Sequence, residues 1–462
     1  MLEMPAMEPA WNLLPYPTLE QYKTSLLWMQ DWLNREGITT AHDAWMEFDP
    51  NYYGAYDELA EEGNLTVRYR GSWYIDPALN YMADIQFGLW LSEGFNHPHF
   101  KMHSFKFLAD NAIEGETALL LEPYAHRPDY YGIKNWEDAD MVNAFAMVDE
   151  AGHQIHVHVI GDSAAKYTLD ALERVGVSGN RHSLAHLQLA RSEDVIRMGE
   201  LGISAHMSQY WMVIDEYYWN FYLPYLGPDR ANDMYPHQSL FDADVNVTVG
   251  SDFYTSEPDL MKAIYNGMER SNVGGLQLPP ARECVSLEEM LRAATINGAY
   301  ANFLEDEIGS IEVGKKADIV VLSDNLFEIT TEEIPNVEIE MTFFEGNLVY
   351  DQSSSTPVFD QNSSGIINPT CAPTSITLIQ NYPNPFNPIT TISFFLPFAN
   401  SVKVEVFDIS GSRVGVGLAP TRQYPPGTHQ ITFDGSGLPS GIYIYRIQAG
   451  DFSATEKMVL VK

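Results

Sequence analysis

The feature that most constrains this fold is an alternation of short apolar runs with helical patterns between residues 20 and 300. Such alternation indicates parallel β-α-β units, because parallel strands need a crossover connection. Eight such units in about 250 residues close into a barrel. One strand fewer is visible here, so we expect an α/β fold, a (β/α)8 TIM-type barrel that is incomplete by one strand. The runs interpreted as strands are residues 37–45, 65–75, 103–110, 154–162, 181–189, 202–209 and 246–252.

Two of the intervening helices carry end signals in the sequence. Leu169 and Leu172 fall on one face of a predicted helix that Gly176 is placed to end. Ser286 and Glu289 have the spacing of a capping box at the start of another helix. These signals support helices between the strands.

The pattern changes after residue 305. Residues 306–351 read as strands with turns between them, which predicts a small β-rich subdomain beside the barrel of residues 1–305. Residues 352–373 are rich in Ser, Pro and Asn and form a predicted linker. Closely spaced strand patterns then fill residues 374–462, which predicts an all-β sandwich.

Composition excludes several classes of protein. The 26 basic and 63 acidic residues give a formal net charge of −37, so nucleic acid is not an expected partner. No run of about 18 apolar residues exists, and we expect no membrane-spanning segment. Residues 1–17 have neither the basic nor the apolar region of a signal peptide. The spacing of Cys284 and Cys371 indicates neither a disulfide framework nor a metal site, and their state stays open.

Four residues with metal and proton chemistry fall at the ends of different predicted strands. They are Lys106, His158, His186 and Asp252. The carboxyl ends of barrel strands carry the chemistry, so these side chains are placed to converge. Imidazole and carboxylate suit zinc and similar ions. A buried lysine can lose its proton and take up carbon dioxide as an anionic carbamate.

The same segments resemble the amidohydrolase superfamily, most closely the family 3 branch that includes N-substituted formamide deformylases. In that resemblance Lys106 is a bridging lysine, carboxylated in its metal-binding form, and His158 and His186 are metal ligands. Asp252 is a further ligand and the catalytic proton shuttle, and zinc or a similar divalent ion is the implied cofactor. The stretches that carry the resemblance cover residues 20–350 and include FKFLADNAIEGETALLLEPY, HVHVIGDSAAKYTLDALE, RHSLAHLQLA, VTVGSDFYTSEPDL and IGSIEVGKKADIVVLSDN.

Two positions depart from the family pattern. Ala185 stands before the histidine where the family often has Glu, and Asn111 follows Asp110 where the family has Gly. Both departures bear on the substrate preference, which they leave open, more than on the fold.

Further pocket residues are expected next to these strand ends. His42, Tyr210 and Trp211 are candidate substrate-binding residues, with packing as the alternative role of the two aromatic side chains. His156 shares a strand face with His158, two residues away, and we interpret it as structural.

The C-terminal region has a second, independent resemblance. NYPNPFNPITTISFFLP, VKVEVFDISGSRV and LPSGIYIYRIQAG are similar to the type A sorting domain of type IX secretion cargo. Pro383, Pro385 and Pro388 fix an extended entry segment, and Gly441 sits at a turn before the last predicted hairpin. The resemblance implies a secreted or cell-surface protein whose partner is the type IX secretion machinery.

Taken together, the two resemblances imply a secreted metal-dependent hydrolase that acts on non-peptide C–N bonds of small molecules, such as amides or N-formyl groups. A surface binding protein that keeps the barrel as a scaffold is the alternative from another class. A deaminase or a dipeptidase of the same superfamily is the alternative among enzymes.

The start of the sequence leads to a separate expectation. The superfamily's first strand carries a His-x-His pair, and no such pair precedes residues 37–45. A type IX sorting domain acts only after export, which requires a signal peptide. One missing front segment accounts for both observations, and by the resemblance it would hold the first barrel strand. We therefore expect an N-terminally shortened chain, with its first strand missing, weak metal binding, little or no activity and poor solubility.

Overall fold

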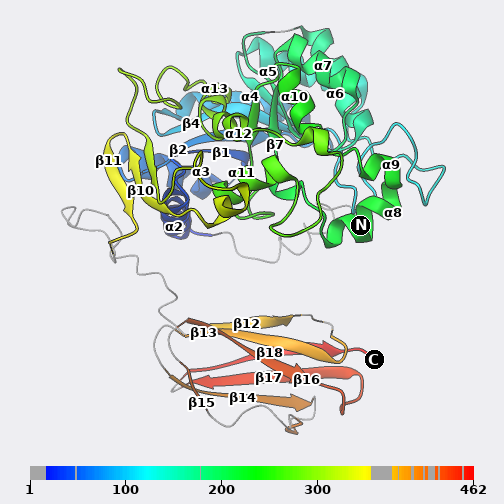
Figure 1. Cartoon of the computed structure of the whole chain (residues 1–462), viewed down its shortest axis with the longest axis vertical. Coiled ribbons are helices and arrows are strands. Elements are labelled where there is room, and N and C mark those ends of the chain that lie inside the picture. Colours follow the sequence, from blue (N-terminus) through cyan, green and yellow to red (C-terminus); the bar gives the residue numbers. More distant parts are fainter. Residues whose placement is uncertain are drawn as a thin grey trace. The chain divides into compact units, whose positions relative to one another are not determined.

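The computed structural model consists of two compact units, Met1–Asp360 and Gln361–Lys462 (Figure 1). The structure describes residues 17–46, 49–176 and 178–354 of the first unit. In the second it describes residues 377–382, 384, 386–396, 400–408, 412–414, 422–424, 427–449 and 452–462. The expectations placed on residues 1–16, on most of the predicted linker and on Cys371, Pro383 and Pro385 lie outside the described residues.

The centre of the first unit is a parallel sheet in the order β1-β2-β4-β5-β6-β7-β8. All seven predicted strands are present, which confirms the expected α/β class. A two-residue strand that was not predicted, β3 (Asn96–His97), pairs antiparallel with β4. The parallel strands are β1 (Thr40–Met46), β2 (Arg68–Tyr74), β4 (Phe100–Leu108), β5 (Gln154–Val159), β6 (Ser183–His186), β7 (Ser204–Met207) and β8 (Val247–Val249).

Helices separate the strands and lie against one face of the sheet (Figure 1). Gly176, with φ 96°, caps the helix it was predicted to end, and Ser286 and Glu289 form the predicted capping box. The helices are α2 (Leu19–Arg35), α3 (Pro50–Glu61), α4 (Tyr81–Gly94), α5 (Asp138–Glu150), α6 (Asp162–Val175), α7 (Ser192–Leu201), α8 (Leu223–Leu226), α9 (Pro228–Ala231), α10 (His237–Asp242), α11 (Leu260–Glu269), α12 (Leu287–Ala294) and α13 (Ile296–Ala301).

The parallel sheet curls into most of a barrel. β1 and β7 are five places apart in the strand order, yet the rings of His42 and His206 lie 5.9 Å apart. Side chains alternate between the two faces of a strand. On β5, Ile155 and Val157 belong to the apolar core, while His156 faces other histidines inside the curl. The sequence therefore places an apolar core outside the sheet and a polar group of residues within it.

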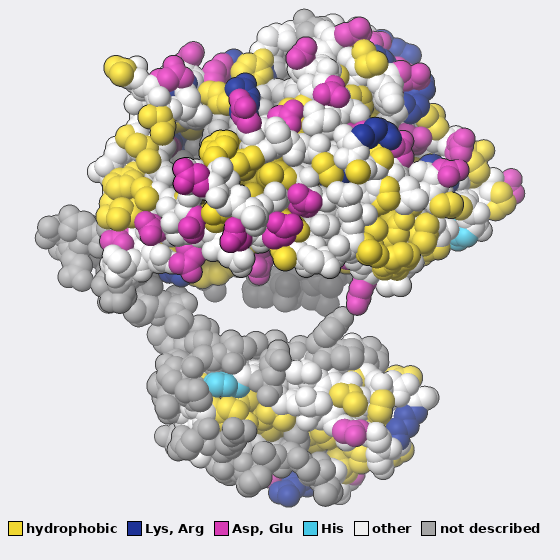
Figure 2. All heavy atoms as spheres, viewed as in Figure 1, with side chains coloured by type: hydrophobic (Ala, Val, Ile, Leu, Met, Phe, Trp, Pro, Cys, Tyr) yellow, Lys and Arg dark blue, Asp and Glu magenta, His cyan; other side chains and the backbone are white. Residues whose placement is uncertain are grey.

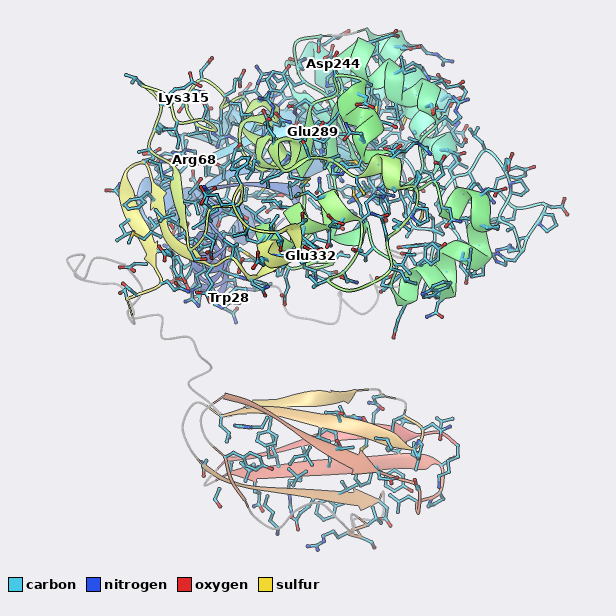
Figure 3. All side chains as sticks on the ribbon, viewed as in Figure 1. Trp28, Arg68, Asp244, Glu289, Lys315 and Glu332 are labelled. Atoms are coloured by element: carbon cyan, nitrogen blue, oxygen red, sulfur yellow. The ribbon has the colours of Figure 1, made fainter. Side chains whose placement is uncertain are left out.

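A three-stranded antiparallel sheet completes the first unit, in the order β11-β10-β9. Its strands are β9 (Ile319–Leu322), β10 (Ile339–Phe344) and β11 (Asn347–Asp351), which confirms the β-rich pattern predicted after residue 305. The fully buried Arg68 forms ion pairs with Asp318 and Glu345 and ties this sheet to the start of β2 (Figure 3).

The second unit contains two antiparallel sheets. One is β12 (Thr377–Tyr382), β13 (Ile389–Leu396) and β16 (Gly427–Asp434); the other is β15 (Arg422–Tyr424), β14 (Asn400–Asp408), β17 (Gly441–Ala449) and β18 (Phe452–Leu460). Ile392, Val404 and Ile447 are among the buried residues of their common core. The backbone N–H of Asn381 donates to the Tyr445 hydroxyl at 2.8 Å and joins the sheets. This is the expected all-β sandwich.

The described surface agrees with the composition. Acidic side chains, in magenta, are scattered over the visible face of the first unit (Figure 2). Among the described residues, no helix has the length and apolar character needed to cross a membrane.

Candidate metal and active site

Three of the four predicted site residues lie on adjacent strands of the curled sheet. Lys106 is on β4, His158 on β5 and His186 at the last position of β6. The ring centroids of His158 and His186 are 4.7 Å apart. Parallel strands end at the same rim of the sheet, so the sequence brings these groups together there. Lys106, His158 and His186 are called the upper site below.

Hydrogen bonds hold both upper-site imidazoles. Nε2–H of His158 donates to the Asn111 carbonyl at 3.2 Å, which leaves Nδ1 with its lone pair. Nδ1 of His186 lies 3.1 Å from the Ser208 hydroxyl. A hydrogen-bond partner on the second ring nitrogen is typical of metal-binding histidines, because it fixes the tautomer and the ring orientation. His186 also has a φ of 74°, a left-handed conformation that turns the chain at the end of β6.

Burial sets the charge state of these groups. It lowers the pKa of His158 and of His186 well below the ordinary range, and their mutual repulsion and Lys106 add to the effect for His158. Burial also lowers the pKa of Lys106 to about 8, against the opposing effect of the negative charge of Asp252. Neutral imidazoles and an accessible neutral amine are the forms that metal binding and carbamate formation require.

Asp252 lies three residues beyond the end of β8, on an exposed turn with φ 51°. The Thr255 hydroxyl donates to its carboxylate at 3.2 Å. Its negative charge raises the pKa of Lys106 and of His158 against the effect of burial. It belongs to no group of three metal-binding side chains among the described residues whose ligand atoms lie within 4.8 Å of one another.

The two predicted aromatic residues have different surroundings. The ring of Trp211 stacks on His186 with centroids 5.0 Å apart, and its Nε1–H donates to the Ser256 hydroxyl at 3.1 Å. Tyr210 is buried, and burial, with smaller effects from Asp259 and Glu36, raises its pKa. Trp211 therefore forms a wall of the upper site, while Tyr210 lies toward those carboxylates.

A buried carboxylate holds the loops around His158. Backbone N–H groups of Leu119, Ile160 and Gly161 donate to Asp110 at 2.8 to 3.0 Å. A Cβ at Gly161 would lie 2.0 Å from the Leu119 carbonyl oxygen, so only glycine fits this close approach. Burial raises the pKa of Asp110 to about 7 even with these three donors. Asn111 follows directly and orients His158, a role that sequence reasoning did not assign.

A second group of histidines lies deeper inside the curl. One ring nitrogen each from His42, His156 and His206 lies within 4.8 Å of the others, and these residues are called the histidine triad below. Burial lowers the pKa of all three, for His206 to about 4. His42 was predicted at the pocket and His156 as structural; His206 was not singled out. Only the curvature of the sheet brings them together, and no local spacing in the sequence indicates it.

A curled parallel sheet with a histidine-rich interior and a lysine at its rim defines the class of metal-dependent hydrolase barrels. The amidohydrolase family model matches residues 1–350, and the chain belongs to that family. A model of the secretion system C-terminal sorting domain matches residues 380–462. This domain indicates secretion or cell-surface localisation through the type IX system.

Curated relatives match the first unit at modest identity. A putative amidohydrolase of Bacillus subtilis, YtcJ, is 28% identical over 56% of this chain and 49% of its own length. An N-substituted formamide deformylase of Arthrobacter pascens is 26% identical over 49% of this chain and 42% of its own. A 5-methylthioadenosine/S-adenosylhomocysteine deaminase of Teredinibacter turnerae is 25% identical over 41% of each. The matching part of this chain spans about half the length of YtcJ and less than half the length of the formamide deformylase.

Solved structures share the fold. An uncharacterized metal-dependent hydrolase from Pyrococcus horikoshii has a TM-score of 0.58 at 19% identity, covering 68% of this chain and 62% of that chain. The zinc complex of the atrazine chlorohydrolase TrzN from Arthrobacter aurescens has a TM-score of 0.50 at 16% identity, covering 73% of each. Both confirm the barrel-type architecture.

Proposed function

We propose that this chain belongs to a secreted metal-dependent hydrolase that cleaves non-peptide C–N bonds in small molecules of the amide or N-formyl class. The observation that carries the proposal is the upper site, where two oriented neutral imidazoles and a buried lysine lie at the carboxyl rim of the sheet. The relative named as an N-substituted formamide deformylase supports the substrate class.

The upper-site residues fit a divalent ion. His158 offers Nδ1 and His186 offers Nε2, because the other nitrogen of each ring has a partner. Lys106, as an amine or a carbamate, would provide a third ligand. A bound zinc-type ion would supply a Lewis acid that polarises the scissile carbonyl and makes water more acidic.

The remaining chemistry falls to Asp252. Hydrolysis forms a C–O bond from water to the carbonyl carbon, breaks the C–N bond and moves one proton from the water to the departing amine. An exposed carboxylate at the rim can accept that proton and return it to the amine nitrogen. The exposed turn holds it next to the solvent from which water and substrate arrive.

The aromatic residues next to His186 and next in sequence to Asp252 suit a substrate with an apolar substituent. Trp211 covers His186, and Phe253 and Tyr254, 45% and 77% exposed, follow Asp252 directly. Aromatic faces of this kind bind apolar or aromatic groups. We therefore propose an N-substituted amide or formamide, and the sorting domain would deliver the protein to the type IX machinery for use outside the cell.

The test compares the full chain with a double variant, His158→Asn and His186→Asn, on a panel of an N-formyl amine, a simple amide, an aminopurine nucleoside and a dipeptide. We expect hydrolysis of the first two by the parent and none by the variant, with less bound zinc in the variant by elemental analysis. Turnover of the nucleoside alone would favour a deaminase. Equal zinc content in both proteins would reject the upper site as the metal centre.

A chain that binds zinc at the upper site and is inert on the whole panel would favour the binding-scaffold alternative. Tight binding of an amide without turnover, measured by calorimetry, would support it directly.

A further inference from the structure

The histidine triad gathers side chains from three strands that are not neighbours. His42 comes from β1, His156 from β5 and His206 from β7. Their ring centroids are 5.1 Å apart for His42 and His156, 4.8 Å for His156 and His206 and 5.9 Å for His42 and His206. Barrel interiors are ordinarily filled by branched apolar residues, so three histidines at one level need a separate explanation.

We propose that the histidine triad is a second, structural metal site, which binds one divalent transition-metal ion inside the curled sheet below the upper site. Imidazole nitrogens suit zinc, cobalt, nickel and copper, whereas magnesium and calcium prefer oxygen ligands. The inference does not depend on the proposed reaction, because none of the triad residues is assigned a part in it.

The spacing of the triad is close to that of a metal-bound set. Nitrogens at about 2.1 Å from a tetrahedral zinc ion lie about 3.4 Å from one another. The triad nitrogens lie within 4.8 Å of one another, so an inward movement of about 1 Å would complete the set. Small rotations of the side chains provide such a movement without a change in the strands.

Serine hydroxyls hold the triad rings from outside. Nε2 of His42 lies 2.7 Å from the Ser72 hydroxyl and 3.1 Å from that of Ser104, and Nδ1 of His156 lies 2.9 Å from that of Ser183. Hydrogen bonds to the non-ligating nitrogen are what metal-binding histidines normally have. Nε2 of His206, in contrast, is buried with no hydrogen-bond partner among the described residues. An unpartnered imidazole nitrogen in a buried group of histidines is available to bind a metal ion.

The triad and the upper site are different levels of the same interior. His156 and His158 lie two residues apart on β5, which separates them by about 6.6 Å along the strand. His206 pairs with Ala185, one residue before His186. Metal ions that share ligands in two-metal sites are about 3.5–4 Å apart. The two groups adjoin, since Lys106 pairs in register with His156, but they have no residue in common. An ion in the triad would therefore share no ligand with an ion in the upper site.

The test measures cobalt binding by the metal-free full chain and by four variants. Cobalt is used alone, because its visible absorption reports the ligand number and its amount per chain can be counted. We expect His206→Asn to lose one equivalent of cobalt and to keep the upper-site equivalent. His158→Asn with His186→Asn should keep the triad equivalent, and cobalt should still raise its melting temperature.

His103→Asn is the matched control. Its ring lies 5.3 Å from that of His42, and both its nitrogens are buried without hydrogen-bond partners in the described part of the chain, yet it is outside the triad. We expect it to bind as much cobalt as the parent. Ser183→Ala keeps all three ligands and should weaken the triad equivalent about 10- to 100-fold, which tests the site even if His206→Asn folds poorly.

Three results would overturn the proposal. The first is full cobalt uptake by His206→Asn, and the second is an equal loss in His103→Asn. The third is no cobalt uptake by the His158→Asn and His186→Asn protein. That third result leaves the upper site standing, whereas a parent protein that bound only the triad equivalent would count against the proposed function and not against the triad.

Discussion

The two units of this chain fill their interiors in opposite ways. Inside the curled parallel sheet lie His42, His156 and Lys106, whereas Ile392 and Ile447 are typical of the sandwich interior. Burying an ionisable group is unfavourable unless it is paired or neutral, so such groups are a burden in a purely structural core. The difference indicates that the barrel interior is suited to binding metal ions, whereas the described sandwich interior is filled mainly by packing apolar side chains.

The largest expected effect is on localisation. Deleting residues 375–462 should leave a folded barrel unit that stays in the periplasm of the producing cell, because the sorting domain lies entirely in that segment. Fractionation and circular dichroism would measure location and folding. If the protein without residues 375–462 still reached the surface or the medium, the second unit would not be what directs secretion.

Next in size is the effect of Asp252→Asn. An amide cannot shuttle a proton, so we expect hydrolysis to fall about 10²- to 10⁴-fold with an unchanged melting temperature. Asp244→Asn is the matched control, since Asp244 is also exposed, with φ 57°, but precedes β8 (Figure 3). If both variants kept parental rates, the catalytic assignment of Asp252 would be wrong.

Shortening a core side chain of the sandwich should have the opposite effects: stability should fall and the hydrolysis rate should stay the same. Ile447 is fully buried, and Ile447→Ala should lower the free energy of unfolding of the second unit by about 2–5 kcal/mol without changing hydrolysis rates. Ile442→Ala, on the same strand but 46% exposed, should change it by about 0.5 kcal/mol or less. Urea unfolding followed beside an activity assay separates the outcomes; a parallel loss of activity would show that the units are coupled.

The smallest effect concerns the contact between the barrel and its three-stranded sheet. Burial would raise the pKa of Glu345, but hydrogen bonds from Lys316 and Arg68 lower it to about 2. A carboxyl whose folded pKa is depressed stabilises the fold above its unfolded pKa of about 4.5, and this contribution is lost as the pH falls toward 2.

Glu345→Gln should therefore lower the free energy of unfolding by about 1–2 kcal/mol at pH 6. The difference from the parent should be smaller at pH 3. Denaturant unfolding at the two pH values measures it. A constant difference between parent and variant across this range would mean that the charge of Glu345 plays no part.

The sequence predicted the fold well where local patterns decide it. The seven parallel strands follow from apolar runs, and Gly176 and Ser286 mark helix ends by chemistry that acts within a few residues. β3 was missed because two residues carry no periodic signal. The same reasoning found His158 and His186, since each stands at the end of a recognisable strand.

The sequence could not predict which side chains of distant strands lie close together inside the curled sheet. The pairing of His156 with His206 depends on the curvature of the whole sheet, which no local pattern encodes. The orientation of His158 by the Asn111 carbonyl depends on a backbone atom, which has no side-chain identity to read. Both were visible only after the strands were placed in three dimensions.

The clamp at Asp110 fixes the first part of the long connection between β4 and α5. Residues 110–121 are pinned to the start of α6 through Asp110 and through Asp162, which accepts the Leu121 N–H at 2.9 Å. The next stretch folds back onto this base, since Tyr124 is fully buried and the Leu120 N–H donates to the Tyr131 carbonyl at 2.8 Å. For protein engineering, this leaves the exposed residues 125–129 as a place for sequence libraries of fixed length, in which side chains can change while His158 keeps its aim.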